Sequence, residues 1–283
     1  MKRVIACVAV ALALFTPWAI SSASAQEQTF AIDLSGTRPA VSLSIGERPS
    51  ELWIFDTGAM ASVVDMERAR AWGLNNDGVA HVGSPAGGTP VEGFRTRIAG
   101  ARIGGAQLAE FPAIAMPLPA HLERAGVLSP NAFNGQLVTF DFARSEVRVN
   151  DKTPANTPAG DAVPYHGAHP LPAIPVTVAG QTLQAHLDTG APRGLTFPYA
   201  MAASLPLAGE PVRQQDARFV DGPRPRYTAV LQGEVQVGPM RITNPEIDLI
   251  DGLPFVNVGM RLLSQLTVTL DPAEGRSWAR ANG

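Results

Sequence analysis

The sequence predicts an all-β protein made of two similar lobes related by a pseudo-twofold axis. Its 25 prolines and 27 glycines separate short apolar runs, which favours many strands and turns over long helices. The chain also contains an internal repeat, and a duplicated chain is expected to build the same lobe twice. Short helices are expected only at a few matching positions in the two halves.

The repeat is visible at five pairs of landmarks, whose separations stay between 130 and 134 residues. They comprise a glycine hairpin turn, an Asp-Thr-Gly-Ala segment, a strand-ending glycine and two apolar segments. The pairs are Gly46 and Gly180, Asp56 and Asp188, Gly104 and Gly238, 126–129 and 256–259, and 139–141 and 269–271. Such nearly constant spacing indicates a duplication.

The duplication divides the chain into an N-terminal lobe, 28–150, and a C-terminal lobe, 165–283. The segment 151–164 between them contains Thr-Pro, Gly and Ala without helical or strand periodicity. This composition predicts an exposed linker.

Residues 1–25 resemble a signal peptide. Lys2 and Arg3 precede an apolar run, and Ala23-Ser24-Ala25 has the form of a cleavage site. We expect cleavage after Ala25 and a periplasmic or secreted protein. The alternative is that the apolar run is retained as an N-terminal membrane anchor.

Composition excludes several kinds of chemistry. The only cysteine, Cys7, lies in the predicted signal peptide, so no disulfide, thiol nucleophile or cysteine metal site is expected afterwards. A net charge of −3 gives no indication of a nucleic-acid partner. His166 and His169 lie near the linker without a third ligand, so neither a metal nor another cofactor is expected.

Two short helices are expected after the Asp-Thr-Gly-Ala segments. Asp65 is suited to cap a helix over 66–72, and Gly73 is placed to end it. In the second half, Pro198 suits the first turn of the matching helix.

Asp56 and Asp188 are the candidate catalytic residues. Each follows an apolar strand and leaves it on a tight glycine turn, so a pseudo-twofold axis would bring the two carboxylates together. A single Asp-Thr-Gly is weak evidence, because aspartate is common in ordinary turns. Two at equivalent positions favour a pair that shares one proton, in which one carboxylate acts as base and the other as acid.

The neighbouring residues suit such a pair. Thr57 and Thr189 can form hydrogen bonds across the axis and fix the two loops. Gly58 and Gly190 leave room for backbone beside the carboxylates. The ionised carboxylate would activate a water for attack on a peptide carbonyl, and no metal is required.

The segments 54–59 and 186–191, Ile-Phe-Asp-Thr-Gly-Ala and His-Leu-Asp-Thr-Gly-Ala, resemble the active-site motif of retropepsin-like aspartic peptidases. The resemblance covers both lobes and is closest to the fused bacterial form. It implies acid-protease-like β lobes with a cleft between them that holds an extended peptide. It also implies that the glycine-rich segment 82–88, with Gly87 and Gly88, forms a flap over the substrate.

The resemblance has two departures. Ser129 stands where the family usually has a glycine, which Gly259 keeps in the second lobe, and we expect some strain there. The second lobe has Phe-Val-Asp-Gly-Pro-Arg at 219–224 in place of a glycine-rich flap, so a single dominant flap in the first lobe is expected.

The sequence thus predicts a monomeric aspartic endopeptidase that acts on peptides or proteins, since one chain supplies both aspartates. The alternative is a non-catalytic module that binds extended peptide or cell-wall polymer on the same fold. Arg193 could favour an acidic substrate side chain or could be an ordinary surface residue. Ala59 and Ala191, which lack a hydroxyl, predict a working pH nearer neutrality than in pepsin-like enzymes.

Overall fold

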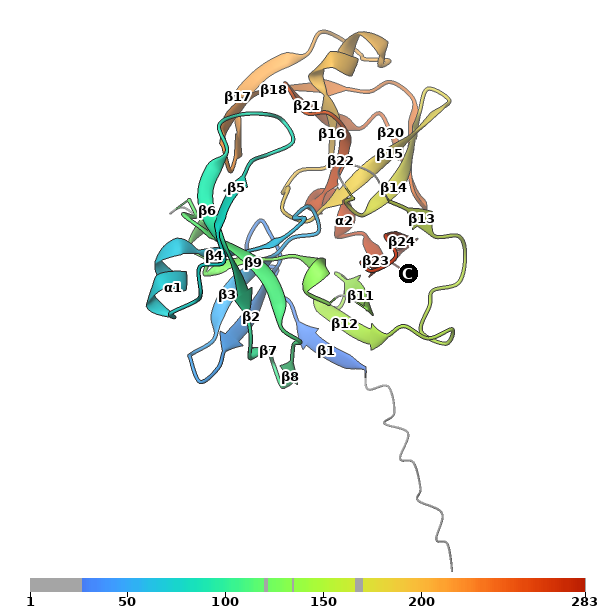
Figure 1. Ribbon diagram of the computed structural model, residues 1–283. Coiled ribbons are helices and arrows are strands. Elements are labelled where there is room, and N and C mark those ends of the chain that lie inside the picture. Colours follow the sequence, from blue (N-terminus) through green and yellow to red (C-terminus); the bar gives the residue numbers. More distant parts are fainter. Residues whose placement is uncertain (1–26, 120–121, 134, 166–169, 283) are drawn as a thin grey trace, which may run out of the picture.

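The computed structural model describes residues 27–119, 122–133, 135–165 and 170–282, and Figure 1 shows their arrangement. The predicted signal peptide and the two histidines near the linker, His166 and His169, lie outside these residues. The described chain forms two nine-stranded sheets and one six-stranded sheet. The prediction of an all-β fold with two lobes is therefore confirmed.

The first lobe is a nine-stranded sheet of order β5-β6-β9-β4-β10-β3-β2-β7-β8. Its strands are β2 (Ala40–Ile45), β3 (Glu51–Phe55), β4 (Ser62–Asp65), β5 (Val79–Val82), β6 (Val91–Ile98), β7 (Ala101–Ile103), β8 (Ala106–Gln107), β9 (Phe111–Met116) and β10 (Gly126–Leu128).

The second lobe repeats this sheet strand for strand, in the order β17-β18-β21-β16-β22-β15-β14-β19-β20. Its strands are β14 (Ala173–Val178), β15 (Gln181–Asp188), β16 (Leu195–Pro198), β17 (Val212–Phe219), β18 (Gly222–Val230), β19 (Glu234–Val237), β20 (Met240–Thr243), β21 (Glu246–Ile250) and β22 (Val256–Gly259). The identical order follows from the duplicated sequence.

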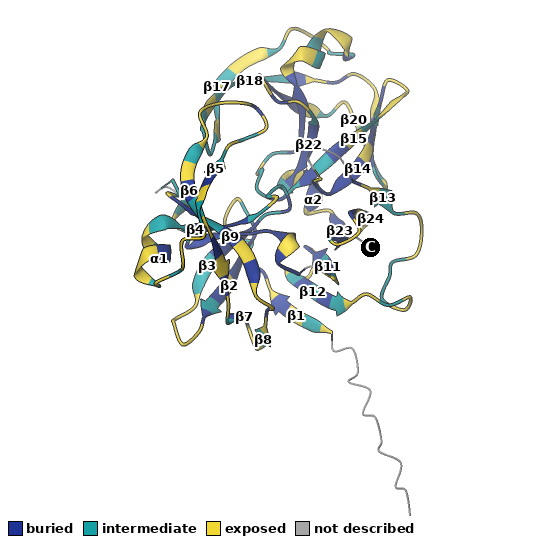
Figure 2. Cartoon of the chain, viewed as in Figure 1, coloured by how far each residue is buried: buried dark blue, intermediate teal, exposed yellow. Residues whose placement is uncertain are grey.

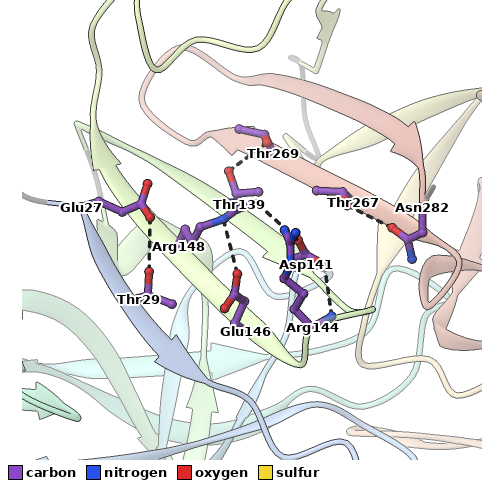
Figure 3. A network of polar contacts seen from close by, with 10 residues as sticks. All are labelled: Glu27, Thr29, Thr139, Asp141, Arg144, Glu146, Arg148, Thr267, Thr269 and Asn282. Carbon is purple, nitrogen blue, oxygen red and sulfur yellow. Dashed lines mark hydrogen bonds and ion pairs between the residues drawn. The ribbon is translucent and has the colours of Figure 1, made fainter.

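A six-stranded sheet of order β1-β12-β11-β23-β24-β13 joins the lobes. Its strands are β1 (Gln28–Ala31), β11 (Gln136–Asp141), β12 (Glu146–Asp151), β13 (Val163–Pro164), β23 (Leu266–Asp271) and β24 (Arg276–Ala281). At its centre β11 pairs with β23, and Thr139 lies opposite Thr269. Their hydroxyls are 2.9 Å apart and form the hydrogen bond drawn in Figure 3, so the pseudo-twofold axis passes between them.

The ends of the predicted linker belong to this sheet. Asp151 is the last residue of β12, and Val163–Pro164 forms β13, which pairs with β24. The linker boundaries themselves remain a prediction.

The hydrophobic core occupies one face of each lobe's sheet and extends to the shared sheet. Trp53, Phe55, Phe140 and Phe197 are its largest fully buried side chains. In Figure 2 the buried segments follow the central strands, and the exposed segments are mostly loops. The core therefore holds the strands that lead into both aspartates as rigid elements.

The short helices occupy matching positions. Asp65 caps α1 (Met66–Ala71) by accepting a hydrogen bond from the Arg68 N–H, and Gly73 follows the helix with φ +67°, as predicted. In the second lobe the segment is a 3-10 helix, η3 (Tyr199–Ser204), and Pro198 precedes it as the N-cap. The placement of Pro198 in the first turn was therefore wrong by one position.

A second matching pair is η2 (Pro130–Phe133) and α2 (Met260–Leu263), which follow β10 and β22. The longest helices in the described part of the chain, α1 and η3, have six residues each, and none there could cross a membrane.

Candidate active site

Strands β3 and β15 deliver the two aspartates to the junction of the lobes. Each strand pairs in parallel with a later strand of its own lobe, β10 or β22. The Asp56 N–H donates to the Leu128 carbonyl at 2.9 Å, and Asp188 lies opposite Gly259. Each aspartate is thus held at a strand end by the backbone of a neighbouring strand.

The threonines lock the two loops together across the axis. The Thr57 N–H donates to the Thr189 hydroxyl at 2.9 Å, and the Thr189 N–H donates to the Thr57 hydroxyl at 3.0 Å. Each hydroxyl then donates to a carbonyl of the opposite lobe, Leu187 at 2.6 Å and Phe55 at 2.7 Å. The structure thus brings together the predicted loop-fixing residues.

The glycines bring the carboxylates side by side. Gly58 and Gly190, one from each lobe, both donate a backbone N–H to Asp56 Oδ1, at 2.8 and 3.1 Å. The Ala191 N–H donates to Asp188 Oδ1 at 3.0 Å. A Cβ atom at Gly58 would lie 2.7 Å from Asp188 Oδ1, and one at Gly190 would lie 2.5 Å from Asp56 Oδ2. A larger residue at either glycine would therefore push the carboxylates apart.

Both carboxyl groups are harder to ionise than usual. Burial, and then the negative charge of Asp56, raise the pKa of Asp188 to about 7. Burial also raises the pKa of Asp56, although the N–H groups of Gly58 and Gly190 and the charge of Arg38 oppose this shift. Two carboxyl groups in this position retain one proton between them near neutral pH.

Two further residues contact the site. Arg38 Nε donates to the Gly190 carbonyl at 2.6 Å and so holds the second loop from the first lobe. Asn257 Nδ2 donates to Asp188 Oδ2 at 2.9 Å, where the first lobe has Val127 at the equivalent position. We did not predict either residue. The sequence does mark Asn257, because it is a polar residue inside the apolar segment 256–259.

Ser129 fits its position without the expected strain. It has no positive φ, is fully buried, and its hydroxyl donates to the Ala59 carbonyl at 2.7 Å. The equivalent Gly259 has no such room, because a Cβ there would lie 2.5 Å from the Arg193 carbonyl and 2.6 Å from the Ala191 carbonyl. The first lobe therefore has room for a side chain at this position, and the second lobe does not.

The glycine-rich segment lies at the tip of the β5–β6 hairpin. Gly87 and Gly88 adopt φ values of +79° and +124°, which other residues rarely adopt. The second lobe carries an equivalent hairpin, β17–β18, and Figure 1 shows the two hairpins next to each other. The expectation of one dominant flap thus misses a second hairpin at the matching place.

The two hairpins are joined by a polar contact. Asp221 on the second hairpin accepts a hydrogen bond from the Ser84 N–H at 2.7 Å and pairs with Arg224 at 2.9 Å. Arg224 Nε donates to the Ala86 carbonyl at 3.2 Å, and Ala86 packs against Ile250 of the second lobe. The Asp221 side chain is only 1% exposed, so the ion pair lies buried within the second hairpin, and both of its members form a hydrogen bond to the backbone of the first hairpin.

The residues that the structure describes contain no group of three His, Cys, Asp or Glu side chains that could hold a metal ion.

Comparison with known proteins agrees with this geometry. A family model described as aspartyl protease matches the chain twice, over residues 41–132 and 174–265, which is more than half of it. Each match contains one Asp-Thr-Gly-Ala segment. The chain therefore belongs to the aspartyl protease family. A search of curated proteins gave no match.

Proposed function

We propose that this protein is an aspartic endopeptidase, in which Asp56 and Asp188 activate a water molecule for attack on a peptide bond. The observation that carries the proposal is the arrangement of the two carboxyl groups. They lie against each other's glycine loops at the lobe junction, and the pKa values of both are raised. Such a pair supplies an acid and a base at the same place.

The hydrogen bonds suggest how the roles divide at the start of the reaction. Asp56 Oδ1 accepts two backbone N–H groups, which favours its ionised form. Asp188 has the pKa of about 7 and carries the shared proton below that pH. Asp56 then takes a proton from water, and the Asp188 proton is donated toward the carbonyl oxygen of the substrate. When the tetrahedral intermediate collapses and the C–N bond breaks, Asp56 gives its proton to the leaving nitrogen, and a hydroxyl of the intermediate returns a proton to Asp188.

The substrate is proposed to lie between the carboxylate pair and the two joined hairpins. An extended peptide there can form backbone hydrogen bonds with the β5–β6 hairpin near Gly87 and Gly88. Separation of the two hairpins, which breaks the Ser84–Asp221 and Arg224–Ala86 hydrogen bonds, would admit it.

We also propose that the active unit is a monomer, because both halves of the pair come from one chain. Residues 1–25 are proposed to direct the protein to the periplasm or to secretion.

A non-catalytic peptide-binding or polymer-binding module remains the second candidate. The raised pKa values argue against it, because a binding module gains nothing from two carboxyl groups that repel each other once ionised.

Cleavage of a peptide library separates the two candidates. The purified protein should cleave defined peptide bonds, and Asp56→Asn and Asp188→Asn should each abolish cleavage while leaving the fold intact by circular dichroism. Equal turnover by all three proteins, or binding without cleavage by the unchanged protein, would contradict the proposal.

A further inference from the structure

The two lobes present different side chains around the carboxylate pair. In each nine-stranded sheet, one face belongs to the hydrophobic core and the opposite face carries the aspartate. We call this second face the dyad face. Residues opposite one another on neighbouring strands lie on the same face of a sheet. The strand registers therefore identify, in each lobe, a row of residues on the dyad face, one from each strand, that starts beside the aspartate.

The row in the first lobe is apolar. It runs across β3, β10, β4 and β9 through Ile54, Val127, Val63 and Ile114. Their sequence neighbours Phe55, Leu128, Val64 and Ala115 belong to the hydrophobic core, whereas these four do not. They therefore lie on the face that carries Asp56, where Ile54 and Val63 are buried and Val127 and Ile114 are half-buried.

The equivalent row in the second lobe is polar. It runs across β15, β22, β16 and β21 through His186, Asn257, Thr196 and Asp248. Every one of the four apolar residues of the first lobe is thus replaced by a residue with a polar side chain. A duplicated chain is expected to have similar residues at equivalent positions. The change from apolar to polar side chains therefore indicates that the two rows contact chemically different groups.

The far end of the polar row carries a surplus positive charge. Asp248 accepts a hydrogen bond from Arg226 Nη1 at 2.6 Å, and both side chains are nearly buried. Arg193 Nη1 lies 3.7 Å from the same carboxylate oxygen, and its side chain is 37% exposed. Two guanidinium groups therefore share one carboxylate. Arg193 is the less tightly held of the two.

The loop that carries Arg193 also differs from its counterpart. Counting back three residues from the row positions Val63 and Thr196 gives Met60 in the first lobe and Arg193 in the second. Met60 is 51% exposed, although it is a large apolar residue. An exposed apolar side chain thus borders the apolar row, and an exposed cation borders the polar row.

Asn257 is the residue of the polar row that contacts the carboxylate pair. Its side chain is more than nine-tenths buried, and its Nδ2 contacts Asp188. Its Oδ1 has no hydrogen-bond partner among the described residues. Buried polar atoms normally have a partner. This acceptor beside Asp188 is itself buried, so a donor from substrate reaches it only when the side chains that cover it move.

We propose that the two rows form unlike substrate subsites. Of two substrate residues at equal distances on either side of the cleaved bond, one would be apolar and the other polar. Aspartate or glutamate would be preferred at the polar position, because a carboxylate there can pair with Arg193. This inference rests on the proposed peptidase function and extends it to the substrate class.

The spacing of the row keeps an acidic substrate side chain at Arg193 away from the carboxylate pair. Asp248 lies three strands from Asp188, which is about 14 Å at normal strand spacing. At that distance the single negative charge of the pair is largely screened, whereas Arg193 would contact the substrate carboxylate directly. A bidentate arginine contact then outweighs the remaining repulsion.

The test uses a peptide library that is randomised at the positions around the cleaved bond, with products read by mass spectrometry. The purified protein should prefer aliphatic residues on one side and glutamate over leucine by about tenfold on the other, as one charge-assisted contact allows. Arg193→Met should reduce the glutamate preference to within about twofold and leave the aliphatic side unchanged. Arg193→Lys should retain part of it.

A matched control is Arg241→Met, since Arg241 is an exposed arginine of the same lobe whose partner is Glu234 on the sheet edge. It should leave both preferences unchanged. The same residue class on both sides, or a glutamate preference that survives Arg193→Met, would overturn this inference alone. Absence of cleavage of every peptide would instead overturn the proposed function, and the inference with it.

Discussion

Thr57 and Thr189 exchange reciprocal backbone-to-hydroxyl hydrogen bonds across the lobe interface, at 2.9 and 3.0 Å. Both side chains are almost completely buried. Neither loop can therefore shift without breaking hydrogen bonds made by the other. The shared sheet sets how the two lobes pair. Through these hydrogen bonds, the pairing of the lobes also determines the positions of the two carboxylates.

Replacing Thr57 by Val should destabilise the protein by about 3 kcal/mol, because it leaves the Thr189 N–H and the Leu187 carbonyl buried without a partner. Peptide cleavage should fall as well, since the loops lose their alignment. Urea unfolding and kcat/KM measure the two effects. Thr57→Ser keeps the hydroxyl and should remain within about 1 kcal/mol of the unchanged protein. A Val variant as stable as the Ser variant would contradict the role of these bonds.

Gly259→Ala should be far more harmful than Ser129→Gly, although the two positions are related by the repeat. The added Cβ at Gly259 would lie within 2.6 Å of two carbonyl oxygens, so the loop that carries Ala191 must move. We expect a loss of about 3 kcal/mol or more. Ser129→Gly removes two hydrogen bonds of the hydroxyl, one to the Ala59 carbonyl and one from the Asn131 N–H, and should cost about 1 to 2 kcal/mol. Similar melting temperatures for the two variants would refute this reading.

Asp221→Asn should loosen the contact between the two hairpins. The change leaves Arg224 without its ion-pair partner and weakens the acceptor for the Ser84 N–H. Hydrogen–deuterium exchange over residues 83–88 should become at least tenfold faster, while exchange in the core strands stays unchanged.

The matched control for that experiment is Asp216→Asn on the same hairpin. Asp216 pairs with Arg213 at the same three-residue spacing, but both side chains are exposed. This variant should leave exchange over residues 83–88 unaltered. Equal exchange rates in the Asp221 and Asp216 variants would show that the buried ion pair does not hold the hairpins together.

The pH dependence follows from the carboxyl pair. Since activity needs one shared proton, kcat/KM should fall about tenfold per pH unit above the pKa of Asp188, which is about 7. Burial is the main cause of this raised pKa, so the alkaline limb belongs near neutrality. A rate that is constant from pH 6 to pH 9 would contradict it.

Adding hydroxyl groups beside the pair tests the same assignment. In the double variant Ala59→Ser with Ala191→Ser, each hydroxyl can donate to a carboxylate and stabilise its ionised form. The alkaline limb should then move toward acid by roughly one unit. An unmoved limb would mean that another group sets the working pH.

Much of the fold could be predicted because the duplication repeats local signals. Gly46 and Gly180 turn equivalent hairpins, and both Asp-Thr-Gly-Ala segments follow a buried strand. Because the pattern is repeated, the same local signals predict both lobes. Two equivalent lobes are expected to pair about a twofold axis, and this pairing brings Asp56 and Asp188 together. The α1 helix was predictable for a local reason as well, since its cap and its stop are adjacent in sequence.

The remaining features depend on contacts between distant residues. Arg38 reaches the Gly190 carbonyl 152 positions away, and no local pattern marks it. Asp221 and Arg224 contact a first-lobe hairpin that lies about 137 positions earlier in the chain. The second hairpin has no glycine-rich segment, so its sequence did not reveal that the two hairpins occupy equivalent places in the fold. The expected strain at Ser129 was wrong because the sequence does not show that the first lobe has room for this side chain. That room depends on how the two lobes differ in three-dimensional packing.

The most direct test is a double-mutant cycle on the carboxyl pair. It compares kcat/KM on one cleaved peptide for the unchanged protein, Asp56→Asn, Asp188→Asn and the double variant. If the two carboxyl groups act as one unit with one proton, each single change should lower kcat/KM by about 10⁴-fold or more, and the double change should add little further loss. Substantial activity in either single variant, or losses that multiply in the double variant, would contradict the shared-proton mechanism.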